Sequence, residues 1–503
     1  MVLDSLNDAA GRPLAQAALS QAALSQADFR LTADSGFGDG WNHYAHSMAW
    51  FRGRLYVGTS RASMAALRLS QPTPRLYPWP ILAPDDLYDI DRRAQIWAYT
   101  PETQSWRMVF RSPQVRGSND RDDVPSYIGL RGMAVHQDVG DPHPCLYVTT
   151  WSPHTAHSPD LLRSEDGEHF APVPRPPFAK TVRAFRTLQP FQGRVHISPT
   201  ASGTAKGFLQ DISSEAVVYA NDDLRTDRWT AVSDEGFGNP DNATVFEMAH
   251  YAGHLYGGTI NPVTGGELWK TRGGDMPYRW TPVITHGAGR GQLNEAAATI
   301  CEFKGALYVA YGIINGGYHR GANIGPSAAE IIRVWPDDSW DLLVGEARTT
   351  DEGLRYPLSG FGPGFDSLFN GYVWRMCVHD GWLYAGTLNW TNTMPYLPMN
   401  LWPEDVIALV RRWGDENLLA RLGGAELWRT NDGIYWEPVT RNGFGNKFNW
   451  GIRTLASTPH GLFVGTANPF APSVAVKRGR QWQYVHNARG GCEVWLGSAG
   501  GAA

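Results

Sequence analysis

The sequence predicts an all-β protein, a seven-bladed β-propeller that is closed by an outer strand from near the N-terminus. Three observations predict this fold. Runs rich in aromatic and β-branched residues alternate with turns that contain Gly or Asp-Gly, as in antiparallel hairpins. The same short motifs recur along the chain with insertions of variable length between them. The composition, with 21 Trp and 55 Gly in 503 residues, is typical of many short strands joined by turns.

The clearest repeat lies between residues 370 and 449. Two hairpins, with turns at Asp380-Gly381 and Asp432-Gly433, predict four antiparallel strands, two before and two after a long insertion. The expected strands are Val373–Val378, Trp382–Thr387, Glu426–Thr430 and Tyr435–Thr440. Four such strands form one blade of a propeller.

The second strand of this unit recurs throughout the chain as variants of Gly-x-Leu-Tyr-Val-Gly-Thr. The copies are Gly53–Thr59, Cys145–Thr150, Gly193–Ser198, Gly253–Thr259, Gly305–Tyr311, Gly381–Thr387 and Gly461–Thr466. The paired third and fourth strands recur only six times, because the last copy stops at Cys492–Gly497. Phe29–Ala33 aligns with the fourth strands of other repeats, so we expect it to complete the last blade. Residues 28–503 would then form one propeller domain.

Three connections between second and third strands are long, at about residues 60–94, 388–424 and 467–491. They belong to blades that are neighbours in the ring, and they are rich in Trp, Tyr, Leu and Pro. We expect lids over one side of the channel mouth that shelter a pocket beneath the sixth, seventh and first blades. Trp402–Leu422 has the apolar spacing of an amphipathic helix. The alternative is that the same insertions form a homodimer interface. Residues 1–27 are Ala-rich and predict a helical extension.

Residues that recur in most repeats are expected to be structural. An Asn stands six residues before the Met, Leu or Ile of the inner strand, at Asn42, Asn242, Asn294, Asn370 and Asn449. An acidic residue begins most third strands, at Asp160, Glu267, Glu330, Glu426 and Glu493. We expect these side chains to bond backbone groups between neighbouring blades. A ring of acidic side chains could also hold a structural cation.

Residues that occur once at channel-facing positions are the candidates for chemistry. Inner strands carry His43, Tyr44, His46, Arg131, Arg183, Arg186, Glu247, Trp374, Arg375, Trp450 and Arg453, and second strands end with Arg61, Trp151 and Trp390. Several arginines that converge on a channel would hold an anion, a carboxylate or a leaving halide. Glu247 is either a base or the partner of one arginine. The alternative is a network of ion pairs that fills the channel.

Other classes of protein receive no support from the sequence. The net charge is −5 without a basic run, so we expect no nucleic-acid partner. No apolar run reaches membrane-spanning length, and the N-terminal residues lack the features of a signal peptide, so a cytoplasmic location is expected. The four cysteines are far apart and are expected to be buried thiols. No pattern of metal ligands or cofactor motif is found, so no metal site or cofactor is predicted.

The motifs LYVGT-x-N, GAELWRTNDG-x-x-W-x-x-V and NGFGN resemble those of a group of bacterial seven-bladed propellers. Phe448–Phe470 is similar to the catalytic propeller of cyanobacterial enzymes that form cylindrocyclophanes. Those enzymes alkylate a resorcinol ring with a secondary alkyl chloride in a Friedel–Crafts-type reaction. They also carry a calcium-binding repeat domain, whose nonapeptides are absent here.

The resemblance implies a small-molecule enzyme of secondary metabolism that forms a C–C bond. Such a reaction needs a base for the phenol proton, a donor for the departing chloride and an apolar surface for the alkyl chain. The sequence offers Glu247 or His46 as the base and Arg375, Arg453 or Arg61 as the donor. Candidates for substrate contact are Tyr44, Trp151, Trp374, Trp390 and Trp450. Two alternatives stay open: a non-enzymatic propeller that binds a peptide, glycan or protein, and a hydrolase or lyase that acts on a small molecule.

Overall fold

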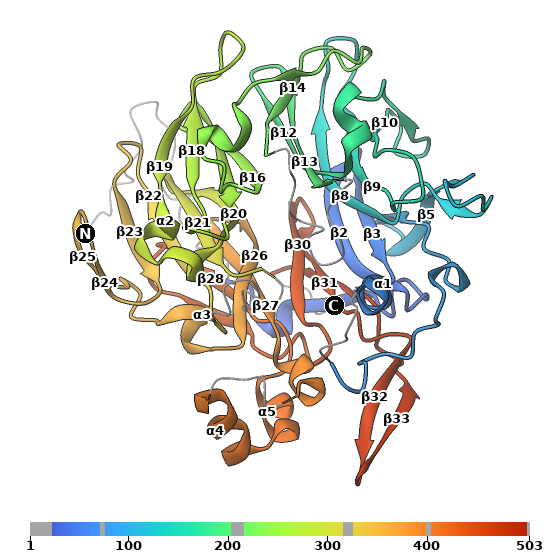
Figure 1. Ribbon diagram of the computed structural model, residues 1–503, viewed down its shortest axis with the longest axis vertical. Helices are drawn as coiled ribbons and strands as arrows, with labels where there is room; N and C mark the ends of the chain where they lie inside the picture. The colour runs from blue at the N-terminus through green and yellow to red at the C-terminus, as the bar shows by residue number, and fades with distance from the viewer. Residues whose placement is uncertain (1–22, 71–75, 203–215, 315–324, 399–403, 500–503) are drawn as a thin grey trace, which may run out of the picture.

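The protein consists mostly of short antiparallel β-strands arranged around a common centre, as in β-propellers (Figure 1). The computed structural model describes residues 23–70, 76–202, 216–314, 325–398 and 404–499. Most of the predicted helical extension, residues 1–22, lies outside the described residues. Its last part contains one short 3-10 turn, η2 (Gln26–Asp28).

The unit predicted between residues 370 and 449 is present as four antiparallel strands. These are β26 (Asn370–His379), β27 (Trp382–Asn389), β28 (Leu427–Thr430) and β29 (Glu437–Thr440), each paired with the next. Asp380 and Gly381 both have positive φ angles, 48° and 75°, as a tight hairpin turn of two residues requires. The Asp-Gly signal therefore located the first hairpin correctly.

The same four-strand arrangement recurs along the chain, and each recurrence begins with a strand near the molecular centre. The groups are β2 (Asn42–Phe51), β3 (Arg54–Arg61), β4 (Gln95–Thr100) and β5 (Ser105–Arg111); β8 (Gly129–His136), β9 (Cys145–Trp151), β10 (Leu161–Ser164) and β11 (Ala171–Pro172); β12 (Val182–Phe191), β13 (Arg194–Ser202), β14 (Tyr219–Asn221) and β15 (Thr230–Ala231); β16 (Thr244–Tyr251), β17 (His254–Ile260), β18 (Leu268–Thr271) and β19 (Thr281–Ile284); β20 (Ala296–Phe303), β21 (Ala306–Gly312), β22 (Glu330–Val334) and β23 (Trp340–Val344). A final group combines β30 (Gly451–Thr458), β31 (Gly461–Ala467) and β34 (Val494–Gly497) with β1 (Phe29–Ala33).

The innermost strands contact one another in sequence order. Strand β2 contacts β8, and the contacts continue through β12, β16, β20 and β26 to β30, which contacts β2. In Figure 1 these strands surround the centre of the molecule. Strand β1 pairs with β34, with Phe29 opposite Gly497. The first and last parts of the chain thus share one sheet.

Apolar side chains fill the spaces between neighbouring groups. Between the first two groups, for example, Tyr56, Ile96, Leu130, Leu146 and Val148 form one buried cluster. The alternating burial that a half-buried strand predicts is replaced by nearly continuous burial in most second strands, because both of their faces are covered.

The recurrent Asn residues are buried at junctions that resemble one another closely. The Asn449 amide donates to the Gly443 carbonyl at 2.9 Å and to the Glu493 carboxylate at 2.6 Å, while Thr466 and Asn468 donate to its oxygen. Asn42, Asn242, Asn294 and Asn370 make the corresponding bonds to a glycine carbonyl and to Gln95, Glu267, Glu330 and Glu426. The acidic residues are therefore structural hydrogen-bond partners. These bonds lie mainly within a group of strands, whereas we had expected them between neighbouring blades.

Variants of the NGFGN motif add an aromatic contact to four of the five junctions, while the Asn294 junction has Ala288 in the place of the Phe. Phe444 adopts a positive φ of 57° and stacks on Trp495 with a centroid distance of 4.9 Å. Phe37, Phe237 and Phe365 have the same conformation and stack on Trp97, Trp269 and Trp428. The burial of two rings offsets the strain of a left-handed phenylalanine.

The remaining elements lie in connections. They are α1 (Ser63–Ser70), η3 (Leu87–Asp89), β6 (Gln114–Val115), β7 (Val124–Pro125), η4 (Pro177–Thr181), η6 (Glu235–Gly238), α2 (His286–Gly289), η7 (Gly291–Asn294), β24 (Arg348–Thr350), β25 (Gly353–Arg355), α3 (Pro363–Asp366), η8 (Thr391–Tyr396), α4 (Glu404–Trp413), α5 (Asp415–Leu422), β32 (Ser473–Arg478) and β33 (Gln481–His486). None of the helices in the described ranges is long and apolar enough to cross a membrane.

The three long insertions pack against one another. Tyr396 accepts a backbone hydrogen bond from Tyr77 and donates its hydroxyl to the Ala475 carbonyl, both at 2.7 Å. The Tyr484 hydroxyl donates to the Trp79 carbonyl at 2.9 Å. The prediction of one helix over Trp402–Leu422 was wrong in detail: α4 and α5 are separated at Gly414, whose φ of 79° interrupts helical geometry. The insertion at 467–491 contains a β-hairpin, β32–β33.

In Figure 1, α4, α5 and the β32–β33 hairpin lie at the lower edge of the molecule. The apolar clusters of the first and third insertions both include Trp450, which directly precedes the innermost strand β30. The lids expected over the channel mouth stay a prediction.

Candidate functional site

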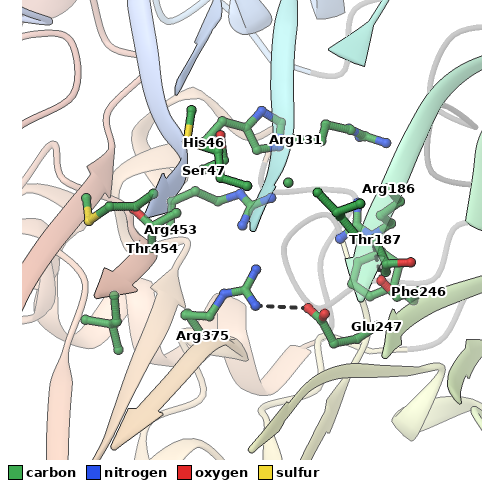
Figure 2. Close-up of a pocket in the computed structure, with 15 residues that line it drawn as sticks. His46, Ser47, Arg131, Arg186, Thr187, Phe246, Glu247, Arg375, Arg453 and Thr454 are labelled. Carbon is green, nitrogen blue, oxygen red and sulfur yellow. Dashed lines mark hydrogen bonds and ion pairs between the residues drawn. The ribbon is translucent and has the colours of Figure 1, made fainter. Parts of the chain in front are cut away.

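A pocket of about 140 Å³ lies between the innermost strands. Its polar wall contains four arginines, one glutamate and one histidine: Arg131, Arg186, Arg375, Arg453, Glu247 and His46. Apolar side chains complete the wall, from Met48, Met133, Leu188, Phe246 and Leu455. Figure 2 shows the charged side chains directed toward a common space from different strands.

Irregularities in the innermost strands place these side chains. Each of these strands shifts register against its partner by one residue near the pocket, which is the pattern of a β-bulge. The residue inside the shift is His46 on β2, Arg131 on β8, Arg186 on β12 and Arg453 on β30. In the other groups it is Phe246, Ala298 or Trp374. Bulges turn side chains out of the regular alternation, and here they bring four polar groups to one level.

One ion pair crosses the pocket. Arg375 donates through Nη1 to Glu247 Oε2 at 3.1 Å, and the two residues follow the bulges of β26 and β16. Glu247 also accepts a hydrogen bond from the Met248 amide at 3.3 Å. Of the two roles expected for Glu247, a base or the partner of an arginine, the structure shows the second, because its carboxylate pairs with Arg375.

The other guanidinium groups lie against aromatic rings. Arg186 lies over Phe246 and also donates to the Phe246 carbonyl at 3.1 Å. Arg131 lies over Trp151 at 4.8 Å and Arg453 over Trp374 at 5.2 Å from the ring centroids. Cation–π contacts stabilise a buried cation without neutralising its charge. With one carboxylate among four guanidinium groups, the pocket wall has a clear excess of positive charge.

Burial lowers the pKa of the Arg453 guanidinium, and repulsion from Arg375, Arg186 and Arg131 lowers it further. Its Nε is buried without a hydrogen-bond partner among the described residues. Because a guanidinium keeps its proton in proteins, this lowering reflects the cost of holding the cation in an uncompensated site. An anion in the pocket would reduce that cost.

Burial also lowers the pKa of the His46 imidazole well below its ordinary value, and Arg453, Arg131, Arg186 and Arg375 contribute in the same direction. His46 is therefore neutral in the empty pocket. It is a poor candidate for the base that the resemblance requires, because its protonated form is repelled by four arginines. Glu247 is the better candidate.

Arg61, predicted as an anion donor, does not line this pocket. Its guanidinium donates to Asn42 at 2.7 Å, to Asp39 at 2.6 Å and to the Asp91 carbonyl at 2.8 Å. Arg61 stands where other repeats have Asn261, Asn389 and Asn468, and it bonds the junction Asn as they do. We correct its role from anion donor to junction residue.

The five aromatic candidates are not part of the pocket wall. Tyr44, Trp374 and Trp450 pack on one another, with Tyr44 5.8 Å from Trp374 and 6.4 Å from Trp450. Tyr44 and Trp374 lie on the innermost strands β2 and β26, and Trp450 directly precedes β30. Trp151 contacts the site through Arg131. Trp390 is buried against Phe369 and serves packing.

Sequence reasoning did not select Arg131 and Arg186 for the site, although both were among the non-repeating residues. A signal was present for part of the set: His46, Phe246, Trp374 and Arg453 each stand four residues after a junction Asn. The second and third groups have Tyr127 and Val182 in the place of that Asn, so the offset does not identify Arg131 or Arg186.

In the described part of the chain, no group of three or more His, Cys, Asp or Glu is arranged to hold a metal ion.

Comparison with known proteins gives only weak structural likeness. No protein-family model matches the chain, and no curated protein matches it. The chain is similar to a Mycobacterium tuberculosis puromycin-hydrolysing peptidase, with 11% identity, a TM-score of 0.45, and coverage of 89% of this chain and 53% of that one. A hypothetical selenium-binding protein from Sulfolobus tokodaii has 11% identity and a TM-score of 0.41, with coverage of 79% and 80%.

An α-L-arabinofuranosidase from Fusarium graminearum has 10% identity and a TM-score of 0.35, with coverage of 69% of this chain and 88% of that one. The chain spans about half the length of the peptidase and of a prolyl endopeptidase, 53% and 51% respectively.

Proposed function

We propose that the central pocket binds a small anionic molecule, a carboxylate or an oxyanion of similar size. The observation that carries this proposal is the set of four guanidinium groups around a single carboxylate. Arginine side chains bind carboxylates and phosphates through paired hydrogen bonds, and partial burial strengthens these bonds. The methionine, leucine and phenylalanine side chains of the wall would contact an apolar part of the same ligand.

An enzymatic function for this pocket would use Glu247 as the base. In the alkylation that the resemblance implies, the carboxylate would take the phenol proton, the C–Cl bond would break, and a ring carbon would form the new C–C bond. The arginines would receive the chloride. The wall lacks the tryptophans that we expected to hold the alkyl chain, so this reaction stays a prediction of the resemblance. Chloride release from a secondary alkyl chloride in the presence of a resorcinol tests it.

We infer that the four-strand groups are the blades of one seven-bladed ring, with β1 closing the last blade. The cyclic contacts of the innermost strands and the pairing of β1 with β34 support this arrangement. A ring places the bulges of all blades at one level around the axis, which is what gives the pocket its converging arginines.

Anion binding is tested by titrating sulfate, acetate and chloride into the protein at low ionic strength, with isothermal calorimetry and thermal unfolding as readouts. We expect saturable binding and a rise in unfolding temperature, since a ligand at a hundred times its Kd stabilises by about 2.7 kcal/mol. Arg453→Met should abolish the saturable component.

The matched control is Arg116→Met, because the Arg116 side chain is 63% exposed and far from the pocket wall. Sulfate also stabilises proteins in general by exclusion from their surface. This control therefore shows the general salt effect. Equal responses of the two variants would contradict the proposal.

A further inference from the structure

We propose that the pocket takes up its anion together with a proton, and that His46 receives this proton. The inference rests on the proposed anion binding and concerns the same site. It explains a feature that anion binding alone does not require, a buried histidine placed among arginines.

His46 lines the pocket and has a ring nitrogen that makes no hydrogen bond to the described residues. The side chain occupies the bulge of β2 and lines the pocket, with 4% of its surface exposed. Its Nδ1 is buried and has no hydrogen-bond partner among the described residues. A buried polar atom without a partner is costly, so an acceptor within the pocket would stabilise a protonated ring nitrogen.

Charged groups face His46 from five other strands. They are Arg131 on β8, Arg186 on β12, Glu247 on β16, Arg375 on β26 and Arg453 on β30. The ring of Tyr44 lies edge-on to His46, with 6.0 Å between the ring centroids. The one carboxylate is already paired with Arg375. In the empty pocket, burial and these arginines hold the pKa of His46 low, so the ring carries no charge.

A bound anion favours the protonated form of His46. Its negative charge opposes the repulsion from the arginines, and its oxygen atoms accept hydrogen bonds from a protonated imidazole. The anion therefore raises the affinity of His46 for a proton. By thermodynamic linkage, a proton on His46 raises the affinity for the anion by the same factor.

His46 is a better proton acceptor than Glu247 once the anion is bound. A proton on Glu247 would weaken its ion pair with Arg375, and the anion would then be the only negative charge beside that arginine in the pocket wall. A proton on His46 breaks no bond of Nδ1 and adds a donor to the pocket. The complex therefore binds more protons than the free protein, so the affinity for the anion rises as the pH falls.

The experiment is a calorimetric titration with sulfate, which does not titrate in the range studied, between about pH 8 and about pH 5. Affinity should rise by up to about tenfold per pH unit, the limit for uptake of one proton. Titrations in two buffers of different ionisation enthalpy should show net proton uptake. His46→Gln should bind sulfate with little pH dependence, whereas His286→Gln, an exposed control, should behave as the original protein does.

Proton counting on the unaltered protein keeps the test independent of whether His46→Gln folds. Sulfate binding with a flat pH profile and no proton uptake would overturn the coupling while leaving anion binding in place. Uptake that persists in folded His46→Gln would assign the proton to another group and also overturn the inference. Absence of sulfate binding at every pH would overturn the proposed function and the coupling together.

Discussion

Two buried histidines of strand β2, His43 and His46, are held in the neutral form by their surroundings. His43 precedes His46 on β2 and is fully buried, and its Nδ1 lies 3.0 Å from the Ser63 hydroxyl. Burial lowers the pKa of His43 to about 3, and the charge of Arg61 acts in the same direction. In the unfolded chain the same imidazole titrates near its ordinary value of 6.5.

This difference predicts that the protein loses stability in mild acid. Below about pH 6.5 the unfolded chain binds a proton that native His43 does not, so the free energy of unfolding falls with pH by up to about 1.4 kcal/mol per unit. The fall continues until the native pKa of about 3 is reached. Unfolding by urea at several pH values measures it.

His43→Asn should reduce the slope of stability against pH by up to one proton, whatever its effect at neutral pH. His286→Asn serves as the control because His286 is exposed. If both variants keep the original slope, His43 is protonated in the native protein and the argument from burial fails.

At the scale of elements, the junctions explain why the repeats keep their Asn and acidic residues while the inner strands vary. Each junction Asn bonds the second and third strands of its own four-strand group and the loop that precedes the group, through side-chain bonds that are buried. Charge-assisted bonds to a buried carboxylate are strong, and the loss of a donor leaves that carboxylate poorly compensated.

Asn449→Ala should therefore destabilise the protein by about 2–3 kcal/mol, because the Gly443 carbonyl and the Glu493 carboxylate each lose a donor. Urea unfolding followed by tryptophan fluorescence measures the change. Asn119→Ala, on an exposed loop, should change stability by less than about 0.5 kcal/mol. A small effect at Asn449 would show that water replaces the lost donor.

The insertions form another element-scale unit, in which three distant segments share one apolar cluster around Tyr396, Phe470 and Val474. Tyr77 and Leu82 remain exposed on this unit, with 80% and 56% of their surfaces accessible. The homodimer expected from these insertions stays a prediction, and sedimentation analysis of the protein measures it.

At the scale of the whole molecule, the proposed ring depends on β1. Phe29 is buried and its ring lies 5.1 Å from Phe444, so β1 contributes apolar packing as well as hydrogen bonds to β34. Without this strand, β34 would be an open sheet edge, and the last group would lose its outer layer.

Deletion of residues 1–33 should abolish cooperative unfolding of the protein. Phe29→Ala should lower stability by about 3–5 kcal/mol, whereas Leu31→Ala, at an exposed position of the same strand, should have a smaller effect. Thermal unfolding by circular dichroism and calorimetry distinguishes these cases. A truncated protein that unfolds as sharply and at the same temperature would show that β1 does not close the ring.

The sequence by itself determined the strands and the junctions, because both depend on local patterns that recur. Turn residues such as Asp380-Gly381 and the Leu-Tyr-Val-Gly-Thr runs specify hairpins, and buried Asn residues reveal themselves by their constant spacing. The pairing of Phe29–Ala33 with the last strand was also predicted from its motif. The grouping of His46, Glu247, Arg375 and Arg453 was anticipated only as convergence on a channel.

Only the tertiary structure decided which channel-facing residues share a pocket. Bulges turn Arg131, Arg186 and Arg453 to the same level, and no junction Asn precedes those of Arg131 and Arg186. Arg61 bonds Asp39 and Asn42 in a junction and does not line the pocket. The length and composition of the insertions likewise did not reveal that they pack on one another, as the bonds from Tyr396 to Ala475 and from Tyr484 to Trp79 show. Such arrangements depend on contacts between different strands and insertions, and local sequence patterns do not encode them.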